Sequence, residues 1–211
     1  RVAKKWQIDP EAVFWDNGYA KPAGPNAGDF NPISIKQIAS EMDETGGPIA
    51  GHHEASIRGV GHSFGVHIAD VEVDPDTGKI TVLRYLVAQD AGRAIHPSYV
   101  EGQFQGGAVQ GIGWALNEEY VYGADGCLQN AAFLDYRIPV ASDLPNIDTV
   151  IVEVPNPDHP FGVRGVGETG IAPPLPALAN AVAAATNVRL RSLPMSPAKV
   201  LKAIKTGSDG C

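Results

Sequence analysis

Two glutamines and two glycines in the middle of the chain stand at the spacing of one helix face. Gln103, Gly106, Gly107 and Gln110 occupy positions i, i+3, i+4 and i+7 of their segment. A side-chain amide offers both donors and an acceptor, and the glycines between the two amides leave the face flat. Residues of these types at this spacing can therefore bind the edge of a flat heterocycle.

The glycines of this segment also allow a second interpretation. Five glycines lie between positions 102 and 113, and each disfavours a helix by about 1 kcal/mol relative to alanine. A helix keeps such residues where another group approaches its backbone closely. That group can be a ligand, or it can be a neighbouring helix or sheet that packs against small residues. The residues alone leave both interpretations open.

A second segment with chemical potential is the loop at 165–170, with the sequence Gly-Val-Gly-Glu-Thr-Gly. Backbone N–H groups in glycine loops of this kind bind phosphates. Glu168 is the one carboxylate among small and apolar neighbours, and a carboxylate with little water around it becomes a better general base. The alternative is a solvated glutamate on a surface turn. Arg164, just before the loop, can face an anionic group or form a salt bridge within the loop.

The loop also satisfies the GxGxxG pattern of dinucleotide-binding folds. That fingerprint directly follows a strand, opens a helix and precedes an acidic residue about 20 positions later. Here residues 155–164 separate the loop from the preceding strand, three prolines delay the next helix, and residues 188–193 contain no acid. A nucleotide-binding enzyme is therefore the least favoured interpretation.

The elements that must position these residues alternate between strand and helix patterns. Dense β-branched residues predict strands, and apolar residues at every third or fourth position predict helices. Strands are expected at residues 66–73, 80–88 and 149–154, and helices at residues 32–42, 97–120 and 177–186. The first two strands flank an Asp-Pro-Asp-Thr-Gly turn and form a hairpin. Because the order lacks a strict βαβ rhythm, we predict an α+β fold with a mixed β-sheet packed with helices.

Composition excludes several classes of function. The formal net charge is −8 and no basic stripe occurs, so nucleic acid is not an expected partner. Cys127 and Cys211 are the two cysteines, and neither they nor the six histidines show metal-ligand spacing. We therefore expect no metal held by side chains. The sequence contains no stretch long enough to span a membrane, and the low cysteine count favours a cytoplasmic location.

The motifs in this order resemble the C-terminal part of the molybdopterin-binding large subunit of molybdenum hydroxylases, the family of xanthine oxidase and aldehyde oxidoreductase. The similarity lies in five segments: residues 71–78, 90–97, 102–113, 136–139 and 162–168. Each is common alone, and together they are specific.

The resemblance covers about residues 58–204 and implies one lobe of a molybdopterin-binding domain. Residues 1–57 are expected to be a variable linker with part of an upstream element, and residues 205–211 a frayed tail. The first residues read like the end of a helix, so we expect the chain to be a piece of a longer polypeptide.

The resemblance also implies roles for the residues singled out above. Glu168 stands beside molybdenum as the general base, and Gln103 contacts the pterin. The other residues expected to bind the cofactor are Gly106, Gly107, Gln110, Gly165, Val166 and Gly167. In this family a molybdenum-bound hydroxide gives its proton to the glutamate and attacks an electron-poor carbon, while hydride passes to a sulfido ligand. The expected substrate is an aldehyde or an N-heteroaromatic compound.

Further cofactors and partners follow from the same resemblance. Molybdenum is held by the dithiolene of molybdopterin, either as the pterin itself or as its cytosine dinucleotide form. Iron–sulfur clusters and FAD are expected on other domains or subunits, together with the remainder of the large subunit. The competing hypothesis is a non-catalytic binding or interaction lobe, whose glycine helix only packs against a partner. The isolated chain is expected to be inactive, to lack molybdenum and to self-associate through its glycine-rich face.

Overall fold

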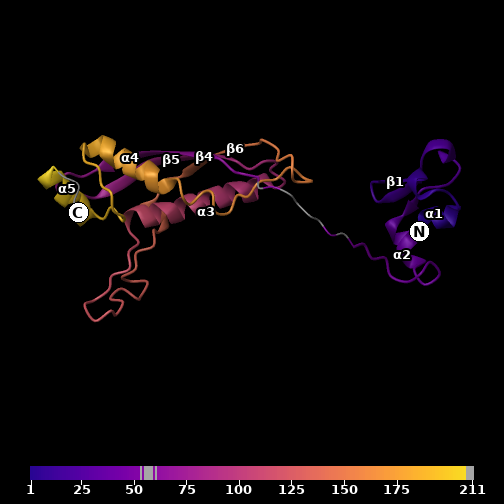
Figure 1. The fold of residues 1–211 in the computed structure, drawn as a ribbon, viewed down its shortest axis with the longest axis horizontal. Helices are drawn as coiled ribbons and strands as arrows, with labels where there is room; N and C mark the ends of the chain where they lie inside the picture. Colours follow the sequence, from indigo (N-terminus) through magenta and orange to yellow (C-terminus); the bar gives the residue numbers. More distant parts are fainter. Residues whose placement is uncertain (53, 55–58, 60, 208–211) are drawn as a thin grey trace. The chain divides into compact units, whose positions relative to one another are not determined.

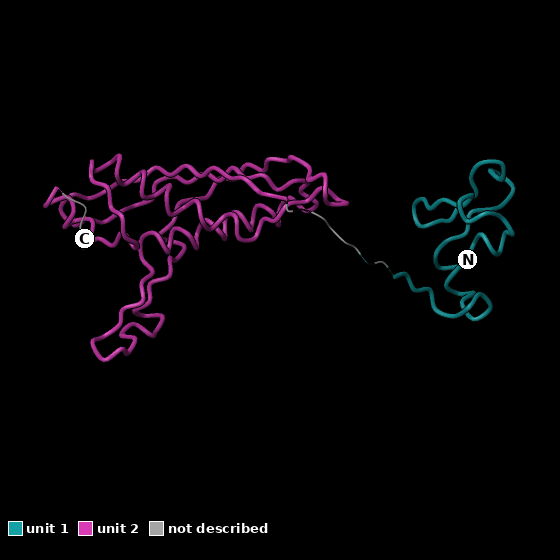
Figure 2. Tube along the Cα trace, in the orientation of Figure 1, with its two compact units in different colours: residues 1–56 teal, residues 57–211 magenta. Residues whose placement is uncertain are grey.

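The structure is a computed structural model that divides into two compact units, Arg1–Ser56 and Ile57–Cys211 (Figure 2). It describes residues 1–52, 54, 59 and 61–207. The domain boundary predicted between residues 57 and 58 lies outside the described residues, as does the tail from residue 208 onward.

The first unit is a small antiparallel sheet with two short helices. Its elements are α1 (Val2–Trp6), β1 (Val13–Asp16), β2 (Tyr19–Pro22), β3 (Ile33–Ser34) and α2 (Ile35–Ser40), with 3₁₀ turns at Pro10–Ala12 and Gly24–Asn26. The strands pair in the order β1-β2-β3. Trp6 stacks on Phe30 with ring centroids 5.1 Å apart, over a core that includes Ala20 and Ile38. These residues therefore form a compact body with apolar packing of its own.

The second unit is built on a three-stranded mixed sheet. Its elements are β4 (Gly65–Val73), β5 (Ile80–Asp90), α3 (Pro97–Leu116), β6 (Ile147–Val152), α4 (Pro174–Thr186) and α5 (Pro197–Thr206), with a 3₁₀ turn at Ala141–Asp143. β4 and β5 form the predicted antiparallel hairpin, and β6 pairs with β5 in parallel. The predicted α+β fold with a mixed sheet is confirmed.

Two helices cover one face of this sheet. α3 packs over β5 and β6, and α4 packs over β4 and beside α3 (Figure 1). The core between the layers contains Tyr85 and Val87 of β5, Phe104 and Ile112 of α3, and Leu178 of α4, all fully or almost fully buried. Burial of these large apolar side chains, each worth about 1.5–3 kcal/mol, fixes α3 on the sheet.

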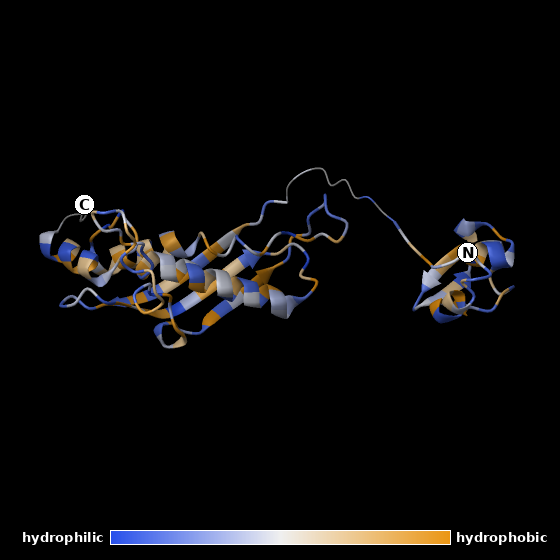
Figure 3. Ribbon diagram, turned by 90° about the horizontal axis from the view of Figure 1, so that it is seen from below, coloured by the Kyte–Doolittle hydropathy of each residue, from blue (hydrophilic) through white to orange (hydrophobic). Residues whose placement is uncertain are grey.

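The opposite face of the sheet also carries apolar side chains, and these are exposed. Exposed and half-buried positions alternate along β4, and the strands of this unit carry both hydrophilic and hydrophobic residues (Figure 3). Val66 and Ile68 of β4 point away from the helices, as do Val150 and Val152 of β6. A sheet with apolar residues on both faces is typical of one that is covered on both sides in the complete protein.

The predicted helix at residues 97–120 is one turn too long. Its apolar period continues to Tyr120, but α3 ends at Leu116 and the Tyr120 side chain is 64% exposed. The amides of Asn117 and Glu118 both bond to the carbonyl of Gly113, and the chain then leaves the helix for a projecting arm (Figure 1). The apolar period of the helix therefore continues into residues that belong to the arm, and this is why the sequence predicts a longer helix.

Three other elements differ from the predictions. α5 and the β1–β3 sheet were not predicted, and α4 begins at Pro174, three residues before its expected start. Two of the three prolines expected to delay α4, Pro174 and Pro176, stand in its first turn, and Pro173 is its N-cap residue. Proline is tolerated there because the first turn needs no amide donors within the helix.

A histidine–tyrosine pair lies on the inner face of the sheet. His67 Nδ1 is 3.0 Å from the hydroxyl oxygen of Tyr85, and His67 Nε2 is buried without a hydrogen-bond partner among the described residues. Burial lowers the pKa of His67 to about 4 and raises the pKa of Tyr85. The neutral imidazole is therefore the form that the fold accommodates.

We expect the free energy of unfolding to fall as the pH is lowered from about 6.5 to 4, because the unfolded chain then binds a proton that folded His67 does not. The free energy of unfolding should change by at most about 1 kcal/mol per pH unit, because the imidazole ring is only partly buried and its charge is partly screened by solvent. Urea unfolding of His67→Gln should show a flatter pH dependence in this window. The exposed His96→Gln variant is the control, and equal slopes for both variants would contradict the assignment.

Candidate functional site

Four of the five glycines of α3 fall into two groups with different surroundings. A Cβ atom on Gly107 would lie 3.0 Å from the carbonyl carbon of Gly170, and one on Gly111 would lie 2.6 Å from the oxygen of Ile171. Gly102 and Gly106 have nothing within 4 Å of the same position. The helix therefore meets the loop backbone to backbone at Gly107 and Gly111, and is bare at the other two glycines.

The two glutamines of the predicted face are exposed on α3. Gln103 lies one turn before Gly107, and Gln110 lies beside Gly111. Neither side chain forms a hydrogen bond to another residue in the described part of the chain. Both amides thus keep their donors and acceptors available for a ligand.

The structure brings the loop of Glu168 against this helix. Gly170, which packs on Gly107, follows Glu168 by two residues, and the amide of Ile171 donates to the carbonyl of Glu168 at 3.2 Å. Gly165 and Gly167 are exposed, with open space where a side chain would stand. The two motifs predicted to form one site, far apart in sequence, lie next to each other.

Two residues of the loop differ from the sequence-based picture. Val166 is partly buried and packs against the apolar core, so its side chain holds the loop down. Glu168 is exposed, and the described residues do not shield its carboxylate from water. The apolar neighbours in the sequence therefore do not by themselves create the water-poor surroundings expected of the base. Any such shielding has to come from outside the described residues.

A buried amide lies beneath the contact between helix and loop. Gln89, near the end of β5, is fully buried, and neither its Oε1 nor its Nε2 atom has a hydrogen-bond partner in the described residues. Its Oε1 is 3.7 Å from the Cβ position of Gly170. Sequence analysis missed this residue, although a glutamine at the end of an apolar strand is unusual enough to be a signal.

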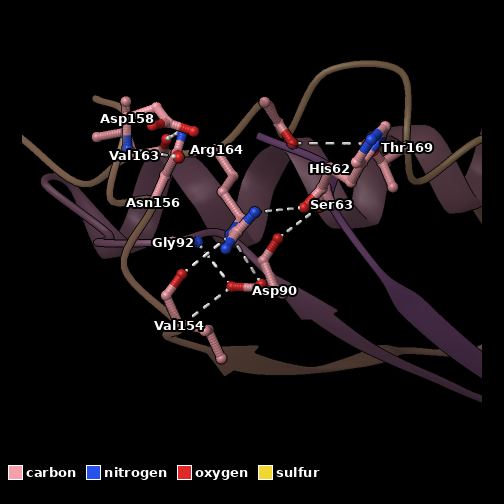
Figure 4. Close-up of polar contacts among 11 residues, drawn as sticks. His62, Ser63, Asp90, Gly92, Val154, Asn156, Asp158, Val163, Arg164 and Thr169 are labelled. Carbon is pink, nitrogen blue, oxygen red and sulfur yellow. Dashed lines mark hydrogen bonds and ion pairs between the residues drawn. The ribbon is translucent and has the colours of Figure 1, made fainter. Parts of the chain in front are cut away.

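Arg164 and Asp90 form a nearly buried ion pair at the start of the loop (Figure 4). Arg164 Nε lies 3.0 Å from Asp90 Oδ2, with side chains that are 13% and 9% exposed. The other carboxylate oxygen accepts hydrogen bonds from the amides of Gly92 at 2.8 Å and Val154 at 3.1 Å. Of the two roles considered for Arg164, the structure shows the salt bridge.

The residues on this surface fit a flat cofactor that binds through hydrogen bonds. Unpaired amides, bare helix glycines and an open glycine loop lie on adjoining elements. Among the described residues, no three His, Cys, Asp or Glu side chains are grouped to hold a metal ion. No helix in the described ranges has the length and hydropathy to cross a membrane.

Comparison with known proteins identifies the family. A family model described as the molybdopterin cofactor-binding domain matches residues 1–145. The chain belongs to this family. The match includes β4, β5 and α3. It also includes residues 1–57, where the sequence motifs showed no resemblance.

Individual relatives are named as subunits of dehydrogenases. The chain is 41% identical over 206 residues to the gamma subunit of the 6-hydroxypseudooxynicotine dehydrogenase complex of Paenarthrobacter nicotinovorans, covering 92% of this chain and 25% of that subunit. It is 36% identical over 174 residues to a putative xanthine dehydrogenase molybdenum-binding subunit of Escherichia coli, covering 80% and 23%. This molybdopterin-binding chain therefore spans about a quarter of the length of these curated relatives.

A solved structure agrees with the fold. Quinoline 2-oxidoreductase from Pseudomonas putida superposes with a TM-score of 0.78 at 28% identity, over 97% of this chain and 27% of that one. The arrangement of sheet and helices described above thus occurs in a solved enzyme of this kind.

The two groups of glycines predict opposite effects of alanine on stability. Gly111→Ala should lower the free energy of unfolding by about 1–3 kcal/mol, because its methyl group would overlap the backbone of Ile171. Gly106→Ala should raise it by up to about 1 kcal/mol, because the position is open and alanine favours the helix. Urea unfolding of both variants checks this matched pair, and a shift of the same sign in both would contradict it.

Proposed function

We propose that the chain is the C-terminal part of the large subunit of a molybdopterin-dependent hydroxylase or dehydrogenase. In the complete protein it oxidises the carbon of an aldehyde or an N-heteroaromatic compound, with Glu168 as the general base. The observation that carries the proposal is the packing of Gly170 on Gly107, because it sets the loop of Glu168 beside the helix face of Gln103. Family membership supplies the cofactor class.

The cofactor is bound by the two faces that adjoin this contact. Gln103 and Gln110 bind its polar edge through their unpaired amides, while Gly106 and the exposed part of Gly107 let it approach the helix backbone. The amides of Gly165, Val166 and Gly167 line the other side. These groups are donors and acceptors on two segments that pack against each other, which is what orienting a flat cofactor requires.

Glu168 takes up the proton that is lost as an oxygen nucleophile attacks the substrate carbon. The bound molybdenum centre supplies the two-electron oxidation. Because the Glu168 side chain is exposed in this chain, the cofactor, the substrate and the rest of the subunit must exclude water around it. Gly167 has no side chain to block the approach of a substrate to the carboxylate.

The names of the relatives favour heteroaromatic substrates. They refer to 6-hydroxypseudooxynicotine, xanthine and quinoline, all nitrogen heterocycles. We carry this class over to the complete protein, with aldehydes as the second class, because an aldehyde oxidoreductase of Megalodesulfovibrio gigas is 37% identical over 159 residues.

Partners and further cofactors lie outside this chain. Electrons released at molybdenum leave through iron–sulfur clusters and FAD on other domains or subunits, because iron–sulfur ligation needs more cysteines than the two present. The pterin is used as such or as its cytosine dinucleotide form. We propose that the remainder of the large subunit covers the exposed face of the sheet at Val66, Ile68, Val150 and Val152. The low cysteine count favours the cytoplasm.

A non-catalytic lobe remains the second candidate, because a specific observation favours it. The packing of Gly107 and Gly111 against the loop explains these two glycines without any ligand. It does not explain why Gly102 and Gly106 are bare, or why two glutamines beside them have free amides. Loss of bound pterin in the complete protein on Gln103→Ala and Gln110→Ala, measured after release of the cofactor, would separate the two candidates.

In the complete enzyme, Glu168→Gln should lower kcat by at least about 10²–10⁴-fold, because glutamine keeps the shape of the side chain but cannot accept a proton. Molybdenum content should stay near that of the unaltered enzyme. The control is Glu72→Gln, an exposed glutamate of β4 far along the strand from the loop. Steady-state kinetics together with elemental analysis make the test, and substantial turnover by Glu168→Gln would falsify the base role.

Residues 1–211 expressed alone should fold, contain no molybdenum and show no oxidoreductase activity, since a half-site forfeits most of the buried surface of a cofactor this large. Exposed apolar side chains lie on the outer sheet face, so we place self-association there rather than on the glycine-rich face predicted from the sequence. The double substitution Val66→Lys and Ile68→Lys should reduce self-association in sedimentation experiments. Gln103→Lys is the control, and dissociation by the control instead would show that the glycine-rich face is used.

A further inference from the structure

The loop that carries Glu168 is fixed at both ends, and between them Val166 packs against the core and the Thr169 hydroxyl donates to the carbonyl of Gly165 at 3.5 Å. At its beginning, the amide of Arg164 donates to the carbonyl of Ala91 at 3.0 Å, and Val163 forms an isolated β-bridge with Gly92. At its end, Gly170 packs on Gly107. The position of the Glu168 carboxylate therefore depends on how firmly these two ends are held, in addition to the anchoring of Val166.

The side chain of Arg164 ties the beginning of the loop to three other segments (Figure 4). Its Nε contacts Asp90 at the end of β5 and also donates to the carbonyl of Val154 at 2.9 Å. Its Nη1 donates to the carbonyl of His62 at 2.6 Å. One planar guanidinium thus bonds acceptors from three segments, and only the fixed fork of arginine has this geometry.

A buried ion pair of this kind is poorly explained by stability. Removing both charges from water is costly, and well-packed apolar residues often stabilise a protein as much or more. What an ion pair adds is a fixed geometry. Gly92 supports the same conclusion, because its φ of +64° and the close approach of Gly162 leave no room for a side chain. The segments are held in register at the point where the Glu168 loop begins.

We propose that Asp90 and Arg164 are positioning residues for Glu168, which they hold in place for proton transfer without touching the substrate. The proposal rests on the proposed function of Glu168 as general base. It assigns Arg164 to the loop and not to an anionic group of the cofactor. Displacement of a catalytic group by about 1 Å can cost about 100-fold in rate, so loosening this end of the loop should act on catalysis.

The decisive variant in the complete enzyme is Arg164→Lys. Lysine keeps the charge beside Asp90, so the variant is expected to fold. Its three N–H donors share one nitrogen, however, and cannot reach acceptors that lie around two different nitrogens of the arginine fork. We expect kcat to fall by about 10–100-fold, with KM and molybdenum content little changed. Hydrogen exchange of the backbone amides at residues 165–171 should become faster. The control is Arg84→Lys, because Arg84 forms the same pair with Asp70 on the surface, with side chains 73% and 48% exposed.

A second comparison asks whether Arg164 acts through Glu168. In a Glu168→Gln background, Arg164→Lys should cause no further fall in the residual rate, because the group that it positions is already absent. Independent, multiplicative losses would overturn the proposal, as would kinetics and exchange equal to those of Arg84→Lys. Full activity of Glu168→Gln would refute the base role itself. The exchange data would then decide separately whether the ion pair holds the loop.

Discussion

The carboxylate of Asp90 is buried at the end of β5, and a buried charge must be met by hydrogen-bond donors or a cation. Its donors come from Gly92, Val154 and Arg164, which belong to the turn after β5, the end of the β6 region and the start of the glycine loop. These segments cannot separate without leaving the charge unpaired. The place of the Glu168 loop over the sheet is a consequence of that requirement.

A second constraint is steric and comes from the absence of side chains. Only glycine at positions 107 and 111 lets α3 approach the backbone of residues 170 and 171. The bare glycines on the same helix have no such contact and leave its surface open beside Gln103. Packing therefore explains Gly107 and Gly111, and ligand binding stays the proposal for Gly102 and Gly106 on the same helix. Neither interpretation accounts for all of them alone.

Local patterns predicted the elements that depend on local chemistry. The hairpin follows from its turn, and the buried stripe of α3 follows from apolar residues such as Phe104 and Ile112, which the sheet then covers. The pairing of β6 in parallel with β5, the contact of Gly107 with Gly170 and the bond between Asp90 and Arg164 join residues far apart in sequence. A single sequence contains no signal for such distant pairs. The proximity of the loop and the helix could therefore be predicted only from the family resemblance.

The exposure of Glu168 shows what this chain supplies and what it leaves to the remainder of the protein. Position is fixed from within, by the ion pair at one end of the loop and glycine packing at the other. The described residues do not remove water from Glu168, because they leave its carboxylate open to solvent. A base needs both to work near neutral pH. For the proposed base role of Glu168, this separation has a physical advantage. The carboxylate stays solvated in this lobe and so costs little to its stability, and in the proposed complete site cofactor and substrate then remove the water.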